Sequence, residues 1–290
     1  MMTMTPIRSK GFSLIELLVA LAIGLLITLV VTQAYLSGVG SQRAQTDLGR
    51  AQESSRFAFD LMARSLRKAG YKNPKAPGTG FCDSSSLPRL VVINDPATIK
   101  PDAINLVGST VTVSNTSDAI RVRYYGDGLT STPFTTDATM RDCLGNTIAS
   151  NTLVSDTFFI AADTTNNNEP ALFCYSSNAT GSGSVPLVPG VESMQILYGE
   201  DTDGDGAVNR YVSGSSINTN NANNVRSVML SLVARTANAN AVDRSAQTID
   251  HFGTNYNRSG DAGSRFITPA DGRTRQHFST TIALRNLCPV

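Results

Sequence analysis

The 290-residue chain contains no tryptophan and only two histidines, His251 and His277. Neither histidine lies in an H-E-x-x-H pattern, and neither is close in sequence to a cysteine pair of the kind that holds zinc. The sequence also lacks a G-x-S-x-G turn and a Walker A loop. Because the common signatures of metalloproteases, α/β-hydrolases and P-loop NTPases are all missing, we expect a protein that is not an enzyme.

Charge is scarce and nearly balanced, with 24 Lys and Arg against 23 Asp and Glu and a net charge of +1. Such a balance gives no general electrostatic reason to expect nucleic acid as a partner. Three acidic residues in the middle of the chain, Asp156, Asp163 and Glu169, have no evident partner in the sequence. We expect them to be solvated loop residues.

The four cysteines, Cys82, Cys143, Cys174 and Cys288, are far apart in the sequence, which excludes a C-x-x-C metal or redox motif. An even number in an exported chain predicts two disulfides, whereas a chain kept in the cytoplasm would hold four buried thiols. Four cysteines allow three pairings, and the sequence alone does not choose between them. The short loop favours Cys143 with Cys174, which leaves Cys82 with Cys288.

A long apolar stretch near the N-terminus dominates the first fifth of the chain. No Asp, Glu, Lys or Arg occurs from Leu17 to Gln42, and the most apolar part, Leu17 to Leu36, would span about 30 Å as a helix. Arg8 and Lys10 precede it, so the positive-inside rule places the N-terminus in the cytoplasm and sends the rest outward. No small-x-small cleavage pattern of an ordinary signal peptide ends the run.

One carboxylate, Glu16, lies at the start of this apolar stretch, in the sequence Gly11-Phe12-Ser13-Leu14-Ile15-Glu16. The hexapeptide, its basic leader and the apolar run resemble the processing site of type IV prepilins and pseudopilins. The resemblance implies that residues 1–11 are a leader, that a prepilin peptidase cuts between Gly11 and Phe12, and that the new amine of Phe12 is methylated. It also implies that Glu16 pairs with the Phe12 amine of a neighbouring subunit in the fibre.

The helical pattern continues beyond the apolar run. No proline occurs from Gln42 to Ala69, and apolar residues recur there at steps of three and four. Gly70 is suited to end the helix. We therefore predict one helix from about Phe12 to Ala69, with a membrane-spanning half at 12–36 and an amphipathic half at 37–70.

The rest of the chain, residues 71–290, is rich in Ser, Thr, Asn and Gly and favours β-structure linked by loops. The predicted strands are Arg89–Asn94, Ala119–Tyr125, Thr157–Ala161, Ala171–Ser176, Val191–Tyr198, Val225–Arg235 and His277–Asn286. The predicted fold class is α+β, in which the long N-terminal helix packs on a mainly antiparallel sheet.

Three stretches resemble the PilW family of type IV pilus minor pilins: residues 56–71, the strand and acidic turn at 191–212, and the ending at 280–287. Residues 75–150 resemble nothing we can place. The resemblance implies a minor pilin that helps to prime pilus assembly and lies near the pilus tip. The implied partners are other minor pilins, the major pilin, the prepilin peptidase and the inner-membrane assembly platform. The implied location is the inner membrane, with the C-terminal domain in the periplasm, and then the surface pilus.

Two other functions stay open at this point. A GspJ-like minor pseudopilin of type II secretion would share the N-terminal chemistry. A tip subunit that contacts DNA or a surface directly would use its long loops and four arginines, namely Arg258, Arg265, Arg273 and Arg275. The plainer interpretation of those arginines is a solvated face.

The acidic turn places Asp201, Asp203 and Asp205 at alternate positions before a glycine, with Asn209 four residues after the last of them. This is the start of a calcium loop, and a hard cation would relieve the repulsion between three carboxylates. The pattern then fails, because Val212 stands where an EF-hand needs a bidentate glutamate. The candidate cofactor is a weak, structural Ca²⁺ ion, and the alternative is a solvated Asp-Gly turn.

Overall fold

The computed structural model describes residues 11, 13–73, 90–93, 117–127, 136–178, 184–218, 221–239, 244–256, 261 and 263–286. Residues 1–10 of the leader, Phe12, Cys82, Arg258 and Cys288 lie outside these ranges. By its contacts the chain divides into two units, Met1–Thr46 and Asp47–Val290, which are described separately below. The domain boundaries expected from the sequence stay a prediction.

One helix, α1 (Leu14–Lys68), forms the N-terminal part of the chain, close to the predicted bounds. Its first turn carries a capping box, in which the backbone N–H of Ser13 donates to Oε2 of Glu16 at 2.9 Å and the N–H of Glu16 donates to Oγ of Ser13 at 3.4 Å. After its last turn, Gly70 adopts a φ of 74°, the left-handed conformation that a glycine supplies at little cost.

Within the first unit, the helix exposes its apolar side chains on all sides. The large apolar side chains from Leu14 to Leu36 are between 53% and 78% exposed, and the most apolar window has a mean hydropathy of 2.9. The hydroxyls of Thr28 and Thr32 donate back to the carbonyls of Leu25 and Thr28 at 2.9 and 2.7 Å. The segment is therefore long and apolar enough to cross a membrane, and the hydroxyls of its two threonines are satisfied within the helix.

The second unit contains two antiparallel sheets. The first has the order β1-β2-β5-β6-β7, with β1 Leu90–Ile93, β2 Ala119–Tyr125, β5 Leu153–Asp163, β6 Glu169–Ser176 and β7 Ser184–Pro189. The second has the order β13-β10-β8-β9, with β8 Val191–Glu200, β9 Arg210–Ser213, β10 Val225–Arg235 and β13 Arg275–Ala283.

Two small hairpins complete the described strands. They are β3 (Thr136–Arg141) with β4 (Thr147–Ala149), and β11 (Thr248–Asp250) with β12 (Arg265–Ile267). Short 3₁₀ helices, η2 (Gly214–Ser216) and η3 (Ala222–Asn224), lie between β9 and β10.

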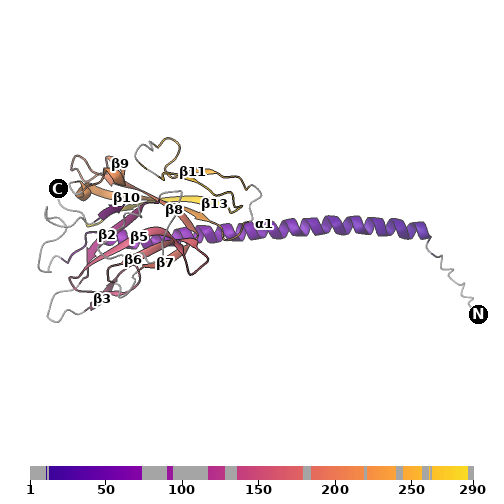
Figure 1. Cartoon of the computed structure of the whole chain (residues 1–290), viewed down its shortest axis with the longest axis horizontal. Coiled ribbons are helices and arrows are strands. Elements are labelled where there is room, and N and C mark those ends of the chain that lie inside the picture. Colours follow the sequence, from indigo (N-terminus) through magenta and orange to yellow (C-terminus); the bar gives the residue numbers. More distant parts are fainter. Residues whose placement is uncertain are drawn as a thin grey trace, which may run out of the picture. The chain divides into compact units, whose positions relative to one another are not determined.

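The second half of α1 and both sheets share one hydrophobic core (Figure 1). Met62 and Leu66 of α1 are fully buried in the same cluster as Phe158 of β5, Ile196 of β8 and Leu230 of β10. The helix therefore needs only one apolar stripe here, because its other face stays in water. The predicted fold class is confirmed, although the strands form two main sheets rather than one.

All seven predicted strands are present, and β5, β6 and β8 extend beyond their predicted bounds. The prediction for the last strand was wrong at its end, since β13 stops at Ala283 rather than Asn286. Strands β3, β4, β7, β9, β11 and β12 were not predicted. They are three to six residues long and, in β7, interrupted by Pro186, so the alternation that reveals a strand has little length in which to develop.

Candidate functional site

The N-terminal motif is exposed in the first unit. Gly11 is exposed, and among the described residues no atom lies within 4 Å of the position that its Cβ would occupy. Glu16 lies in the first turn of α1, where the helix dipole favours a carboxylate, and its Oε2 is bonded to the Ser13 amide. The S-x-x-E spacing could have revealed this capping box from the sequence. Because Phe12 lies outside the described residues, its pairing with Glu16 stays a prediction.

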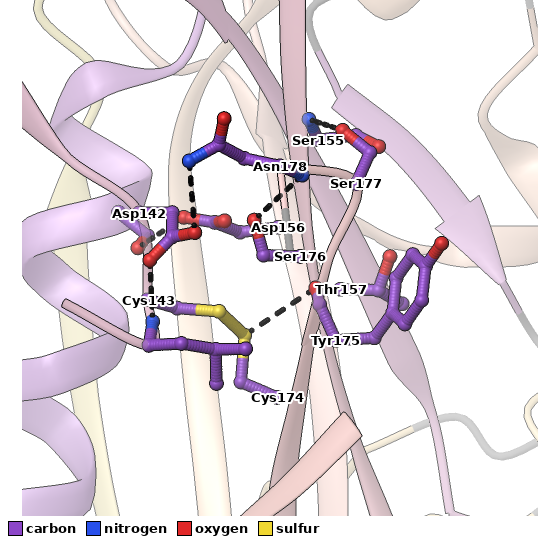
Figure 2. The surroundings of a disulfide bond; sticks show 12 residues. Asp142, Cys143, Ser155, Asp156, Thr157, Cys174, Tyr175, Ser176, Ser177 and Asn178 are labelled. Atoms are coloured by element: carbon purple, nitrogen blue, oxygen red, sulfur yellow. Dashed lines mark hydrogen bonds between the residues drawn. A yellow bond between two sulfur atoms is a disulfide. The ribbon is translucent and has the colours of Figure 1, made fainter. Parts of the chain in front are cut away.

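A disulfide joins Cys143, in the turn between β3 and β4, to Cys174 in β6 (Figure 2). The two Cα atoms are 6.4 Å apart, within the normal range for a disulfide. The bond closes a loop with a sequence separation of 31, which corresponds to roughly 3–4 kcal/mol of loop-closure entropy. It is the pairing favoured from the short loop, whereas the pairing of Cys82 with Cys288 stays a prediction.

Asp142 holds the turn that carries Cys143. Its Oδ1 accepts from the backbone amides of Leu144 and Asn146 at 2.9 and 2.8 Å, and its Oδ2 accepts from the side chain of Asn178 at 3.3 Å. Figure 2 shows Asp142 and Asn178 on the same side of the disulfide. The β3–β4 turn is therefore attached to the five-stranded sheet both covalently and through this carboxylate.

Asp156 of β5 lies beside the disulfide and is completely buried, so the expectation of a solvated loop residue was wrong (Figure 2). Its Oδ2 accepts from the hydroxyls of Tyr124 at 2.7 Å and Ser65 at 3.0 Å, and lies 3.7 Å from Nζ of Lys68. We call these four residues the Asp156 cluster. Burial raises the pKa of the Asp156 carboxyl, although the Lys68 charge and the hydrogen bonds oppose the shift.

The Asp156 cluster fixes the end of α1 to the five-stranded sheet. Lys68, in the last turn of the helix, also donates to the Tyr124 hydroxyl at 3.0 Å and to the Arg141 carbonyl at 2.7 Å. Burial lowers the pKa of Lys68, and the nearby carboxylates oppose that shift. Since Ser65 and Lys68 come from α1 while Tyr124 and Asp156 come from β2 and β5, the cluster can form only in the folded unit.

A second set of ion pairs links the two sheets. Arg235 of β10 binds Glu169 of β6 at 2.6 Å and Glu192 of β8 at 3.0 Å, and Arg275 of β13 binds Glu192 at 2.7 Å. The expectation that Glu169 is a solvated loop residue was therefore wrong. Arg275 has only 3% of its side chain exposed.

These pairs also bear on the arginines considered for contact with DNA. Arg275 binds Asp271 as well as Glu192, Arg273 lies 3.5 Å from Glu169, and Arg265 lies 3.3 Å from Asp250. Arg258 is outside the described residues. Three of the four arginines thus face carboxylates of their own chain, and the arrangement does not favour a surface that binds nucleic acid.

The acidic turn follows β8 and is anchored by a buried ion pair. Asp201 is 2% exposed, and its Oδ2 lies 2.8 Å from Nη2 of Arg226. The amides of Gly204 and Gly206 donate to the two oxygens of Asp201 at 2.7 and 3.0 Å. Burial would raise the pKa of Asp201, but these amides and Arg226 outweigh it, so the pKa is lowered.

The other carboxylates of the turn are exposed. One oxygen from each of Asp201, Asp203 and Asp205 lies within 4.8 Å of the others, a spacing that a cation between them would fit. Asn209 closes the turn instead, since its Oδ1 accepts from the amide of Thr202 at 2.6 Å and its Nδ2 donates to Asp203 at 3.2 Å. The turn is therefore held by the chain's own bonds, and the calcium ion stays a prediction.

His251, which follows β11, inserts against the face of the four-stranded sheet that carries Ser193 and Ser231. Its Nε2 lies 3.0 Å from Oγ of Ser193, and its Nδ1 lies 2.7 Å from Oγ of Ser231. The same Ser231 hydroxyl is 2.7 Å from Nε2 of His277 on β13. Burial, with a smaller effect from His277, lowers the pKa of His251 to about 3, although Asp250 opposes the shift. The neutral imidazole thus attaches the β11–β12 hairpin to the sheet.

We expect acid to weaken the globular unit through this histidine. A folded pKa of about 3 against about 6.5 when unfolded means that the stabilisation is complete above pH 6.5 and is lost as the pH falls toward 3. Between pH 7 and pH 4.5 the loss is roughly 2.5 kcal/mol of unfolding free energy. Urea unfolding of Asp47–Val290 at both pH values measures it. The variant His251→Asn should lose less over this interval, and an equal loss would contradict the assignment.

Two family comparisons match this chain. A family model described as the type IV pilus-assembly protein W matches residues 157–286, from β5 to just beyond β13. A model described as the prokaryotic N-terminal methylation motif matches residues 7–32, which include Gly11, Phe12 and Glu16. Together the two matches support a type IV pilus minor pilin of the PilW family. The PilW match covers both sheets' central strands, and the methylation motif covers the start of α1.

No protein with a curated description matches this chain. Among solved structures, a type IV-like pilin from Thermus thermophilus is similar at 14% sequence identity and a TM-score of 0.45, over 82% of this chain and 96% of that one. At that level the similarity adds no argument. The family matches indicate a structural subunit that interacts with other pilins, and the methylation motif with the apolar helix indicates anchoring in a membrane.

Proposed function

We propose that this minor pilin primes the assembly of the type IV pilus, together with other minor pilins, and is located near the pilus tip. The observation that carries the proposal is the helix from Leu14 to Leu36, whose large apolar side chains are all more than half exposed. A helix of this kind needs lipid before assembly and the helices of other subunits afterwards. It can therefore serve first as an anchor and then as part of a fibre core.

Maturation begins at the membrane. A prepilin peptidase removes residues 1–11 by cutting between Gly11 and Phe12, and then methylates the Phe12 amine. The chain spans the inner membrane once, with its N-terminus in the cytoplasm and its C-terminal domain in the periplasm, as the basic leader favours. The exposed Gly11 and the methylation-motif match support this route.

Assembly then moves the subunit from the membrane into the fibre. Glu16 is held in the first helical turn by Ser13, four residues after Phe12. In an apolar bundle its carboxylate needs a positive partner, and the Phe12 amine of a neighbouring subunit supplies one. The inner-membrane assembly platform carries out the extraction, and the major pilin follows the minor pilins.

Deletion of the gene tests the priming role. We expect few or no surface pili in the deletion strain, with the major pilin retained in the membrane, and recovery when the gene is supplied in trans. Electron microscopy and shearing of surface pili measure this. Secretion of type II substrates is the control, because a pseudopilin would affect secretion instead. Normal piliation in the deletion strain would contradict the proposal.

A further inference from the structure

Within the described residues, the two larger sheets of the second unit have four edges, and three of them are poorly suited to pair with another strand. Edge strands β1 and β9 contain four residues each. Edge strand β7 contains Pro186 and Pro189, which lack the amide that a ladder needs. Strand β9 pairs only with the end of β8, from Leu197 to Glu200. The earlier part of β8 is covered on that side, because Met194 and Ile196 form hydrogen bonds with Ser117 and Asp118. Short strands, prolines and covered edges are the usual protections against unwanted pairing.

Within the described part of the chain, the fourth edge, β13, has none of these protections. It is nine residues long, and its register with β10 runs from Arg275 to Ala283 without a shift. It contains no proline, and after Arg275 it contains no Lys, Arg, Asp or Glu. Within the described residues it pairs with β10 alone. Every second residue of an edge strand directs its amide and carbonyl away from the sheet, so β13 presents an open ladder.

Strand β13 is also continuous with the surface of α1. Near its start, Oε1 of Gln276 accepts from Nε2 of Gln52 at 3.4 Å. Just after its end, Nδ2 of Asn286 donates to the carbonyls of Arg67 and Ala69, both at 3.2 Å. The open edge therefore extends beside the second half of the helix, and pilins of this class assemble with one another.

We propose that the open edge of β13 pairs with an extended strand of a neighbouring pilin subunit. Backbone hydrogen bonds supply the affinity in such an addition, and alternate side chains supply the specificity. The side chains of Ser279, Thr281 and Ala283 in β13 are exposed, small and uncharged. A partner strand can therefore lie beside β13 without having to supply a charged residue. The proposal rests on the proposed function, because it names a subunit contact within the same assembly.

Consecutive prolines test the edge in the full-length chain. Thr280 and Thr281 are neighbours in β13, so one amide faces β10 and the other faces the open edge. The variants Thr280→Pro and Thr281→Pro are each co-expressed with the other minor pilins of the same cell and purified in detergent. We expect the variant whose replaced amide faces the open edge to keep the wild-type melting temperature. The amount of pilins that co-purify with it should fall at least about tenfold. The other variant removes a bond to β10 and melts earlier, which makes it the matched control.

Amide hydrogen exchange gives a second measurement that does not depend on either variant. In the co-purified wild-type complex, the β13 amides facing away from β10 should exchange at least about tenfold more slowly than in the chain alone. Wild-type amounts of pilins with both proline variants, or unchanged exchange in the complex, would overturn the proposal. Because the readout is subunit binding, a deletion strain with normal pili would refute priming without refuting this contact.

Discussion

Replacing Gly11 with valine should leave the chain as an uncleaved precursor and exclude it from pili. Among the described residues, no atom lies within 4 Å of an added Cβ at Gly11, so the fold itself gives no steric reason against a larger side chain there. The loss must then arise at the peptidase, whose recognition pattern has a glycine before the cut. We expect complete or nearly complete loss of processing, because a β-branched residue restricts the backbone at the position where the peptidase must bind an extended segment.

Immunoblotting and intact-mass measurement of membrane fractions check this prediction, since the precursor retains the first 11 residues. Gly40→Ala is the matched control: this glycine is also free of neighbours within 4 Å, but it lies outside the processing motif. The control should be cleaved normally and enter pili. A mature-length chain from Gly11→Val would contradict the assignment of the cleavage site.

Replacing Asp156 with alanine should lower the free energy of unfolding of Asp47–Val290 by about 3–5 kcal/mol. The change leaves the half-buried Lys68 ammonium without its carboxylate and leaves the Ser65 and Tyr124 hydroxyls without their common acceptor. Removing one partner of a buried pair is costly because the other partner stays desolvated. The end of α1 should also lose its attachment to β5.

Urea unfolding at pH 7 measures the Asp156 effect, and Asp60→Ala is the control. Asp60 pairs with Arg64 on the same helix, but both side chains are about half exposed or more, so this variant should cost less than about 1 kcal/mol. If the two variants destabilised the unit equally, the Asp156 cluster would not be the feature that fixes the helix end.

The helix and the longer strands could be predicted from the sequence because their signals are local. The charge-free run from Leu17 to Gln42 and the alternation in β13 are visible without any tertiary contact. The pairing of Cys143 with Cys174 followed from loop length. The capping box at Ser13 and Glu16 also has a local signature, which the prediction did not use.

The buried polar residues could not be predicted, because their partners come from distant parts of the chain. Asp156 is satisfied by Ser65, Lys68 and Tyr124, at sequence separations of 91, 88 and 32. Glu169 of the five-stranded sheet likewise forms an ion pair with Arg235 of the four-stranded sheet. A single sequence contains no pattern that joins such positions, so carboxylates of this kind look like solvated loop residues until the fold is known.

The central claim is that this chain is processed and then built into the type IV pilus. Mass spectrometry of sheared, washed pili from the wild-type strain tests it most directly. The account predicts peptides from both units in the pilus fraction, with an N-terminal peptide that begins at an N-methylated Phe12. A pilus fraction without the chain, or a chain there that still carries residues 1–11, would contradict it.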